Sequence, residues 1–140
     1  MSNTAGQSGF RFFSETFSQA TAATAKETLI AAIPAGVNSK TQLLQLLSRE
    51  LQFPSYFGWN WDALSDCLRD FHWLEQVRRV RIIHETLPFP AGWKKQRLYL
   101  GLLQTAIDAW NSRKEIQLEV LFPESLKRTV QQLLTGTSDT

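Results

Sequence analysis

The chain has 140 residues, a formal net charge of +2, and a content of 43% hydrophobic and 20% charged residues. These values suit one soluble globular domain that is long enough to bury a core. No apolar run approaches the length of a membrane span, and the N-terminus lacks the basic and apolar parts of a secretory signal. The single cysteine, Cys67, cannot form an internal disulfide, so we expect a buried thiol in a reducing, cytoplasmic compartment.

The charges are unevenly distributed along the chain. Residues 26–75 hold four basic and six acidic residues, whereas residues 76–114 hold eight basic and two acidic ones. The net charges of these two stretches are therefore −2 and +6. The acidic and the basic groups thus belong to different parts of the chain.

The N-terminal segment is only partly predictable. Residues 1–9 are small and polar and are expected to be disordered. Four phenylalanines then follow within eight positions, Phe10, Phe12, Phe13 and Phe17. Their spacing suits a helix as well as a short strand. So many phenylalanines are expected to dock on the core, and a second partner site here is the less favoured alternative.

Residues 26–51 predict a strand followed by a helix. The run 26–33 is largely apolar, as in a strand that helices cover on both faces, and Pro34 ends it. Ser39 and Gln42 have the spacing of a capping box. The leucines that continue at helical period are Leu43, Leu44, Leu46, Leu47 and Leu51.

Residues 53–73 predict a turn and a second helix. Gly58 allows a tight or positive-φ turn, and Asn60 is a good N-cap because its side-chain oxygen can accept from a free amide of the first turn. Leu64 and Leu68 then share one face of the helix, as core residues do.

Three aspartates of this helix, Asp62, Asp66 and Asp70, follow one another at intervals of four residues, so on a continuous helix they form a stripe. Like charges at this spacing cost an isolated helix roughly 0.2–0.5 kcal/mol per pair. One interpretation is that Asp62 gains from the helix dipole while the others are merely solvated. The other is an anionic ridge, flanked by Tyr56 and Trp59, that enters a cationic cleft on a partner.

The remaining sequence predicts two strands, at residues 78–85 and 116–121, and a C-terminal helix at 126–134. Between the strands we expect a helix whose buried stripe comprises Tyr99, Leu102, Leu103, Ala106, Ile107 and Trp110. His84 alternates with apolar residues, which favours a core or edge group over a catalyst. Strands that alternate with helices predict an α/β fold with parallel pairing.

The chain resembles the barstar family of ribonuclease inhibitors in one stretch, FP-x-YFG-x-N-x-DAL-x-DCL at residues 53–68. The resemblance implies a small three-stranded parallel sheet flanked by helices over residues 26–122. Residues 1–25 would then be an N-terminal extension, and residues 123–140 an additional C-terminal helix and tail. The resemblance also implies that the turn and the helix after it occlude a ribonuclease active site.

By this resemblance, Asp66 is the expected dominant anchor, Asp62 a second acidic contact and Tyr56 the contacting aromatic. The family often has tryptophan at the position of Ser65 and an acid at that of Trp59. Asp70 is added from its spacing alone. The residues expected at the partner interface are Tyr56, Gly58, Trp59, Asp62, Ser65, Asp66 and Asp70.

The leading functional prediction is a protein inhibitor of a ribonuclease, or an immunity protein against a ribonuclease toxin, with no catalytic residue, cofactor or metal. The alternative is a nucleic-acid-binding or other interaction module that uses the basic block of residues 78–97, which holds Arg78, Arg79, Arg81, Lys94, Lys95 and Arg97. The acidic stretch, where most aromatics lie, would repel a nucleic-acid backbone and argues against this alternative. A third reading, an enzyme that uses His72 and His84, lacks a metal-pair spacing and a glycine-rich phosphate loop. The oligomeric state is not predicted.

Overall fold

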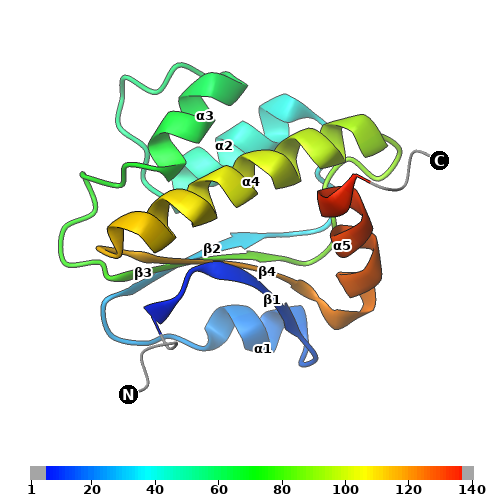
Figure 1. Cartoon of the computed structure of the whole chain (residues 1–140), viewed down its shortest axis with the longest axis horizontal. Coiled ribbons are helices and arrows are strands. Elements are labelled where there is room, and N and C mark those ends of the chain that lie inside the picture. The colour runs from blue at the N-terminus through cyan, green and yellow to red at the C-terminus, as the bar shows by residue number, and fades with distance from the viewer. Residues whose placement is uncertain (1–5, 137–140) are drawn as a thin grey trace.

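The computed structural model describes residues 6–136, which form a four-stranded parallel sheet with helices on both faces (Figure 1). The strands are β1 (Gly9–Phe13), β2 (Thr28–Ile33), β3 (Arg79–His84) and β4 (Gln117–Pro123), and their order across the sheet is β1-β4-β3-β2. The predicted α/β fold with a parallel sheet is confirmed. The predicted number of three strands is wrong, because the N-terminal segment adds β1 beside β4.

The phenylalanine-rich segment forms β1 and then α1 (Phe17–Ala22). Alternation along β1 points Phe10 and Phe12 toward the main core and Phe13 toward a smaller core on the other face of the sheet. Docking of these side chains on the core is thereby confirmed. The sequence did not distinguish strand from helix because five residues contain too few repeats of either period.

A set of hydrogen bonds fixes the start of β1. Ser8 is buried, its amide donates to Oδ1 of Asn111 at 2.8 Å, and its hydroxyl accepts from the Leu118 amide at 2.7 Å. The side-chain amide of Asn111 donates back to the Ser8 carbonyl at 3.1 Å. The disorder expected for residues 1–9 is therefore wrong at Ser8 and Gly9, whereas residues 1–5 lie outside the described residues.

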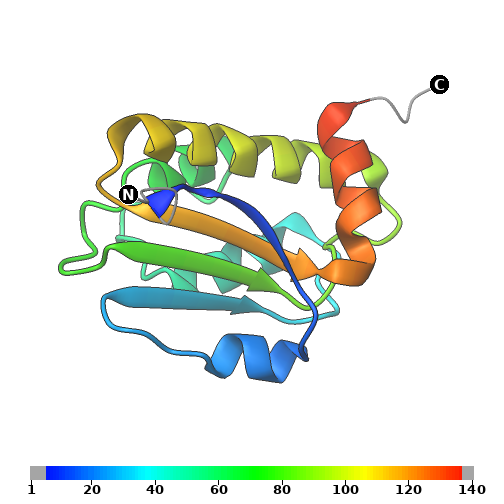
Figure 2. The ribbon, with the colours of Figure 1, turned by 60° about the horizontal axis from the view of Figure 1, so that its bottom comes forward.

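Helices form a layer on each face of the sheet (Figures 1 and 2). One face is covered by α2 (Lys40–Glu50), α3 (Trp61–Leu68) and α4 (Trp93–Arg113), and the other by α1. After β4 the chain forms a short 3-10 turn (Glu124–Leu126) and α5 (Lys127–Thr135), which packs against α4.

The main core lies between the sheet and the layer of α2, α3 and α4. The side chains of α4 that are buried in it are Tyr99, Leu100, Leu103, Ala106, Ile107 and Trp110. Leu102, which was predicted in this stripe, is only half-buried, and Leu100 takes its place. The smaller core on the α1 face comprises Phe13, Ala20, Ile83 and Leu121, so β3 and β4 are covered on both faces.

His84 is a satisfied core residue, as predicted. It is fully buried, with Nδ1 3.0 Å from the Leu121 carbonyl and Nε2 2.8 Å from the Tyr99 hydroxyl. A carbonyl only accepts, so Nδ1 carries the proton and Nε2 accepts from Tyr99. Burial lowers the pKa of His84 to about 4, which keeps the ring neutral at physiological pH.

Two further findings concern residues 6–136 as a whole. None of their helices is long and apolar enough to cross a membrane. Nor do three or more of their His, Cys, Asp and Glu side chains converge in a group that could hold a metal ion.

Candidate partner-binding site

The turn before α3 contains a strained residue. Trp59 has a φ of 56°, a left-handed conformation that favours glycine because it crowds a Cβ atom. The positive φ that the sequence suggested for Gly58 therefore occurs one residue later. A Cβ at Gly58 would meet the Cβ of Ala63 at 3.4 Å, which is an ordinary contact distance, so this turn does not need glycine at position 58.

A series of aromatic rings ties the turn to the core. The Phe57 ring lies 4.9 Å from the Trp59 ring and 4.8 Å from the Phe53 ring, measured between centroids. Phe53 in turn meets Trp73 edge-on at 5.8 Å, and Nε1 of Trp73 donates to the Leu51 carbonyl at 3.0 Å. These contacts hold the turn in one conformation while half of the Trp59 side chain stays exposed.

The start of α3 is capped as predicted. Oδ1 of Asn60 accepts from the Ala63 amide at 2.7 Å, and Nδ2 donates to the Gly58 carbonyl at 3.2 Å. One side chain thus joins the turn to the first turn of the helix. The inner face of α3 is buried through Leu64, Cys67 and Leu68.

Two side chains of α4 hold the C-terminal end of α3. Nε1 of Trp110 donates to the Leu68 carbonyl at 2.8 Å, and Nη1 of Arg113 donates to the Arg69 carbonyl. The last carbonyls of a helix have no partner within the helix, so these donors satisfy groups that would otherwise need water. The rest of the domain therefore fixes α3 at both ends.

Asp62 and Asp66 lie one helical turn apart on α3, and both are exposed. Asp62 is in the first turn, where a carboxylate is favoured by the helix dipole. Its side chain makes no hydrogen bond or ion pair with any other residue of 6–136. This aspartate is therefore available to a partner.

Asp66 has a cation of its own chain beside it. Nη2 of Arg69 lies 2.9 Å from Oδ1 of Asp66, and Nε of Arg69 donates to the Ser65 carbonyl at 3.2 Å. The Asp66 side chain is still 76% exposed, so solvent and partners reach it although it is partly neutralised. Sequence reasoning missed Arg69, but its spacing of three residues from Asp66 was the available signal.

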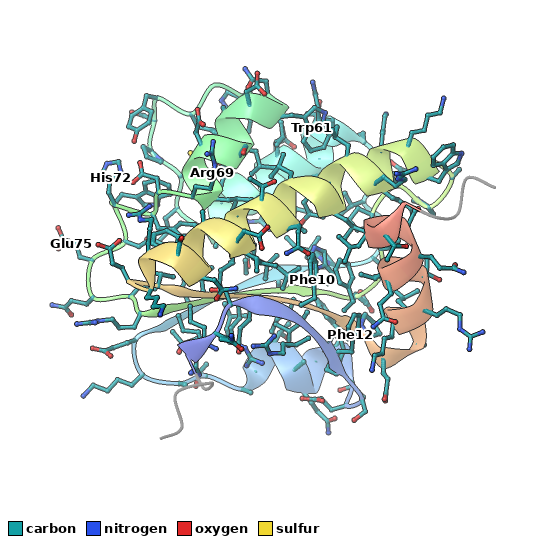
Figure 3. The ribbon with its side chains drawn as sticks, viewed as in Figure 1. Phe10, Phe12, Trp61, Arg69, His72 and Glu75 are labelled. Atoms are coloured by element: carbon teal, nitrogen blue, oxygen red, sulfur yellow. The ribbon has the colours of Figure 1, made fainter. Side chains whose placement is uncertain are left out.

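Asp70 does not extend the stripe, and this part of the prediction is wrong. The helix ends at Leu68, and the chain turns at Phe71, whose φ is 53°. The turn directs Phe71 inward, where its ring stacks on Trp110 with centroids 5.8 Å apart, and this burial replaces a further helical turn. Asp70 instead pairs with His72, whose Nδ1 lies 2.8 Å from Oδ2 of Asp70. Figure 3 shows Arg69 beside the last turn of α3 and His72 on the following loop.

The other predicted interface residues come from the turn and from α3. Tyr56 and Trp59 are exposed by 66% and 51%, and Gly58 is exposed, whereas Ser65 is half-buried. Partial desolvation, followed by the nearby Asp70 carboxylate, raises the pKa of Tyr56 above its usual value. The phenol is therefore neutral and able to donate a hydrogen bond at physiological pH. The roles of these residues in binding stay predictions.

Cys67 is the buried free thiol that the sequence predicted. Burial, then the carboxylates of Asp70 and Asp66, raises its pKa to about 11. A thiol with this pKa is protonated at neutral pH, so it packs as a small apolar group rather than acting as a nucleophile.

A family model described as Barstar (barnase inhibitor) matches residues 28–122. The chain belongs to the Barstar family. The match spans 95 of the 140 residues, and it includes the turn, α3 and every residue predicted at the interface. No curated protein and no solved structure matches the chain.

The Barstar family description names an inhibitor rather than an enzyme. Within this chain the match runs from β2 to β4, so β1, α1 and α5 lie outside it. The division into an extension (1–25), a barstar-like domain (26–122) and a C-terminal part (123–140) stays a proposal.

Proposed function

We propose that this protein inhibits a ribonuclease by inserting α3 and the preceding turn into the active site of the enzyme. The observation that supports this most is the presence of two exposed carboxylates, Asp62 and Asp66, one turn apart on a firmly anchored helix of a Barstar-family domain. An immunity protein against a ribonuclease toxin would use the same geometry.

The chemistry of this occlusion follows from what a ribonuclease must bind. Its cleft gathers cationic side chains to hold the phosphates of RNA. Carboxylates on a helix offer oxygen acceptors to the same cations, and charge-assisted hydrogen bonds in a desolvated cleft are strong and geometrically specific. The helix therefore imitates the RNA backbone without offering a bond to cleave.

The anchoring of α3 supports tight binding. Asn60 caps one end, and Trp110 and Arg113 bind the other. Groups that are already fixed lose less conformational entropy on docking, so more of the contact energy appears as affinity. In this account Asp66 is the central anchor and Asp62 its neighbour.

The aromatic residues around the aspartates complete the proposed contact. The exposed rings of Tyr56 and Trp59 would pack against the rim of the cleft and exclude water from the charged centre. Asp70, which is paired with His72, would be an outer contact.

A pull-down tests the proposal. The wild-type chain and an Asp62→Ala/Asp66→Ala double variant are immobilised, exposed to extract of the native cells, and the eluates are assayed for cleavage of a fluorogenic RNA. The wild type is expected to retain a ribonuclease that the double variant loses, and to inhibit it on titration. Barnase, which the family description names, is the first purified enzyme to titrate. Recovery of no ribonuclease, or equal recovery by both proteins, would contradict the proposal.

A further inference from the structure

The basic residues between positions 78 and 97 separate into two groups when the chain folds. Arg78, Arg79 and Arg81 lie at or near the start of β3, whereas Lys94 and Lys95 lie in the first turn of α4. Because α4 follows the C-terminal end of β3, the two groups lie at opposite ends of the sheet (Figure 2). The strand between them spans ~17 Å at ~3.3 Å per residue.

The arginines of β3 are engaged within the protein. Nε of Arg81 lies 3.0 Å from Oε1 of Glu119, and Arg79 donates from Nη2 to Oε1 of Gln117 at 3.3 Å. A second arginine, Arg11 of β1, lies 3.9 Å from the other carboxylate oxygen of Glu119. These cations belong to a polar network across the sheet, and they leave little uncompensated charge for a ligand.

The start of α4 borders a groove instead. Its volume is about 550 Å³, and its lining consists of Asn38, Phe89, Pro90, Ala91, Gly92, Trp93, Lys94 and Lys95. The Phe89 ring is buried, whereas the Trp93 side chain is 51% exposed. The groove thus combines an apolar wall, an indole ring open to solvent and two ammonium groups.

The cations of this groove have no acidic partner among residues 6–136. Lys94 lies 5.7 Å from the Trp93 ring centroid and Lys95 lies 5.8 Å from that of Phe89, but neither forms an ion pair within that range. Glu85, the acid of the loop between β3 and α4, instead accepts from the Ala35 amide at 2.8 Å. The first turn of α4 holds no acidic residue either, and cations are unfavourable there because the helix dipole is positive at that end. An anion in the groove would relieve this repulsion.

We propose that this groove binds a short segment of single-stranded nucleic acid. One base would stack on the exposed face of Trp93, and the flanking phosphates would contact Lys94 and Lys95. Proteins that bind single strands without sequence preference combine these two features, a basic track for the backbone and aromatic faces for the bases. The nucleic-acid site is thus assigned to one end of the predicted basic block, and the arginines of β3 take no part.

The exposed indole favours a nucleic acid over an acidic protein segment as the ligand. Carboxylate side chains would satisfy the two lysines but would leave the flat face of Trp93 without a matching surface. A nucleobase covers that face, and it carries its phosphate on the same unit.

The groove is separate from the proposed inhibitory surface. The two are linked through the Trp61 ring of α3, which meets Phe89 edge-on with centroids 6.2 Å apart, but none of the predicted interface residues lines the groove. The inference therefore does not rest on the proposed inhibition, and either can fail without the other.

Fluorescence anisotropy with a fluorescein-labelled thymidine octadeoxynucleotide tests the inference, because no ribonuclease can cleave this probe. Binding by the full chain is measured from 20 to 200 mM salt. A Lys94→Ala/Lys95→Ala variant should bind more weakly and lower the salt slope by about 1.4, at about 0.7 per lost phosphate contact with a single strand. A Trp93→Ala variant should weaken binding by about fivefold or more without changing the slope.

The control removes two exposed cations at the other end of the sheet, through Lys26→Ala/Arg78→Ala. It should leave the affinity close to that of the wild type, and circular dichroism should confirm that all variants are folded. Absence of binding at 20 mM salt would overturn the inference. Equal weakening by the control would also overturn it, because binding would then follow overall charge. Displacement of the probe by a glutamate octapeptide at lower concentration than by unlabelled octanucleotide would assign the groove to an acidic protein segment instead.

Discussion

Arg69 holds the carboxylate that the family resemblance marks as the central anchor, with Nη2 2.9 Å from Oδ1 of Asp66. The guanidinium is fixed at the end of α3 because Nε also donates to the Ser65 carbonyl. A partner that uses Asp66 must therefore either displace Arg69 or offer it an acceptor. The free protein thus contains a competitor for its own proposed contact.

Replacing Arg69 by glutamine should strengthen inhibition of the partner ribonuclease. Both side chains of the pair are largely solvent-exposed, and exposed pairs contribute ~0.2–1 kcal/mol, so the inhibition constant should fall by up to about fivefold. Titration of the enzyme with wild type and Arg69→Gln measures this. Arg128→Gln, which removes an exposed charge on α5, is the matched control. Weaker inhibition by Arg69→Gln would show that the guanidinium itself contacts the partner.

Two substitutions of Trp59 should separate backbone strain from partner contact. Both Trp59→Ala and Trp59→Gly remove the ring, but only glycine relieves the left-handed backbone. The glycine variant should therefore be more stable than the alanine variant by about 1 kcal/mol in urea unfolding. Both should inhibit more weakly than wild type to a similar extent. Equal stability of the two variants would mean that the turn relaxes when the ring is removed.

His84 should make the stability of the protein depend on pH. Its pKa is about 4 in the folded protein and 6.5 as the model value, so the unfolded chain takes up a proton first as the pH falls. The contribution is complete above about pH 6.5 and is lost toward pH 4, at about 1.4 kcal/mol per pH unit. The pKa of Tyr99, its hydrogen-bond partner, is raised by burial, so that hydroxyl stays neutral in this range.

Urea unfolding at pH 7 and pH 5 tests this expectation. The wild type should lose about 2 kcal/mol between the two values, in addition to smaller effects of carboxylates. A His84→Gln variant should be less stable at pH 7 but should lose much less between pH 7 and pH 5. The same loss in both proteins would show that other groups produce the pH dependence.

Ser8 should contribute to stability although it lies near the N-terminus. Ser8→Ala removes the acceptor of the buried Leu118 amide, and an unsatisfied buried donor costs about 1–3 kcal/mol. Thermal or urea unfolding measures the loss, and Ser14→Ala, at an exposed position, should have little effect. If the two variants were equally stable, water would have to replace the Ser8 hydroxyl at no cost.

Local signals in the sequence predicted most of the elements. Helical and alternating periods placed the three strands of the family domain and its helices, and Asn60 acted as the expected cap. The fourth strand was not predicted, because β1 is defined by its pairing with β4, more than 100 residues further along the chain. A five-residue segment does not carry that information by itself.

The errors at the site have the same origin. The interval of four residues extended the aspartate stripe to Asp70, but the stacking of Phe71 on Trp110 ends the helix before it. Trp110 lies 42 positions after Leu68, whose carbonyl it binds, so no local pattern shows this contact. The positive φ likewise occurred at Trp59 rather than at Gly58, because the ring contacts of Phe57 with Phe53 and Trp59 fix the turn.

The most direct test of the account is the inhibition constant of Asp66→Ala against the ribonuclease that the wild type retains from extract. The control is Glu15→Ala, which removes an exposed carboxylate between β1 and α1. Loss of a central charged anchor typically costs ~2 kcal/mol or more, so the constant should rise by at least about 30-fold for Asp66→Ala. It should stay unchanged for Glu15→Ala, and both variants should keep the wild-type circular dichroism spectrum. Inhibition by a folded Asp66→Ala protein equal to that of the wild type would contradict the account.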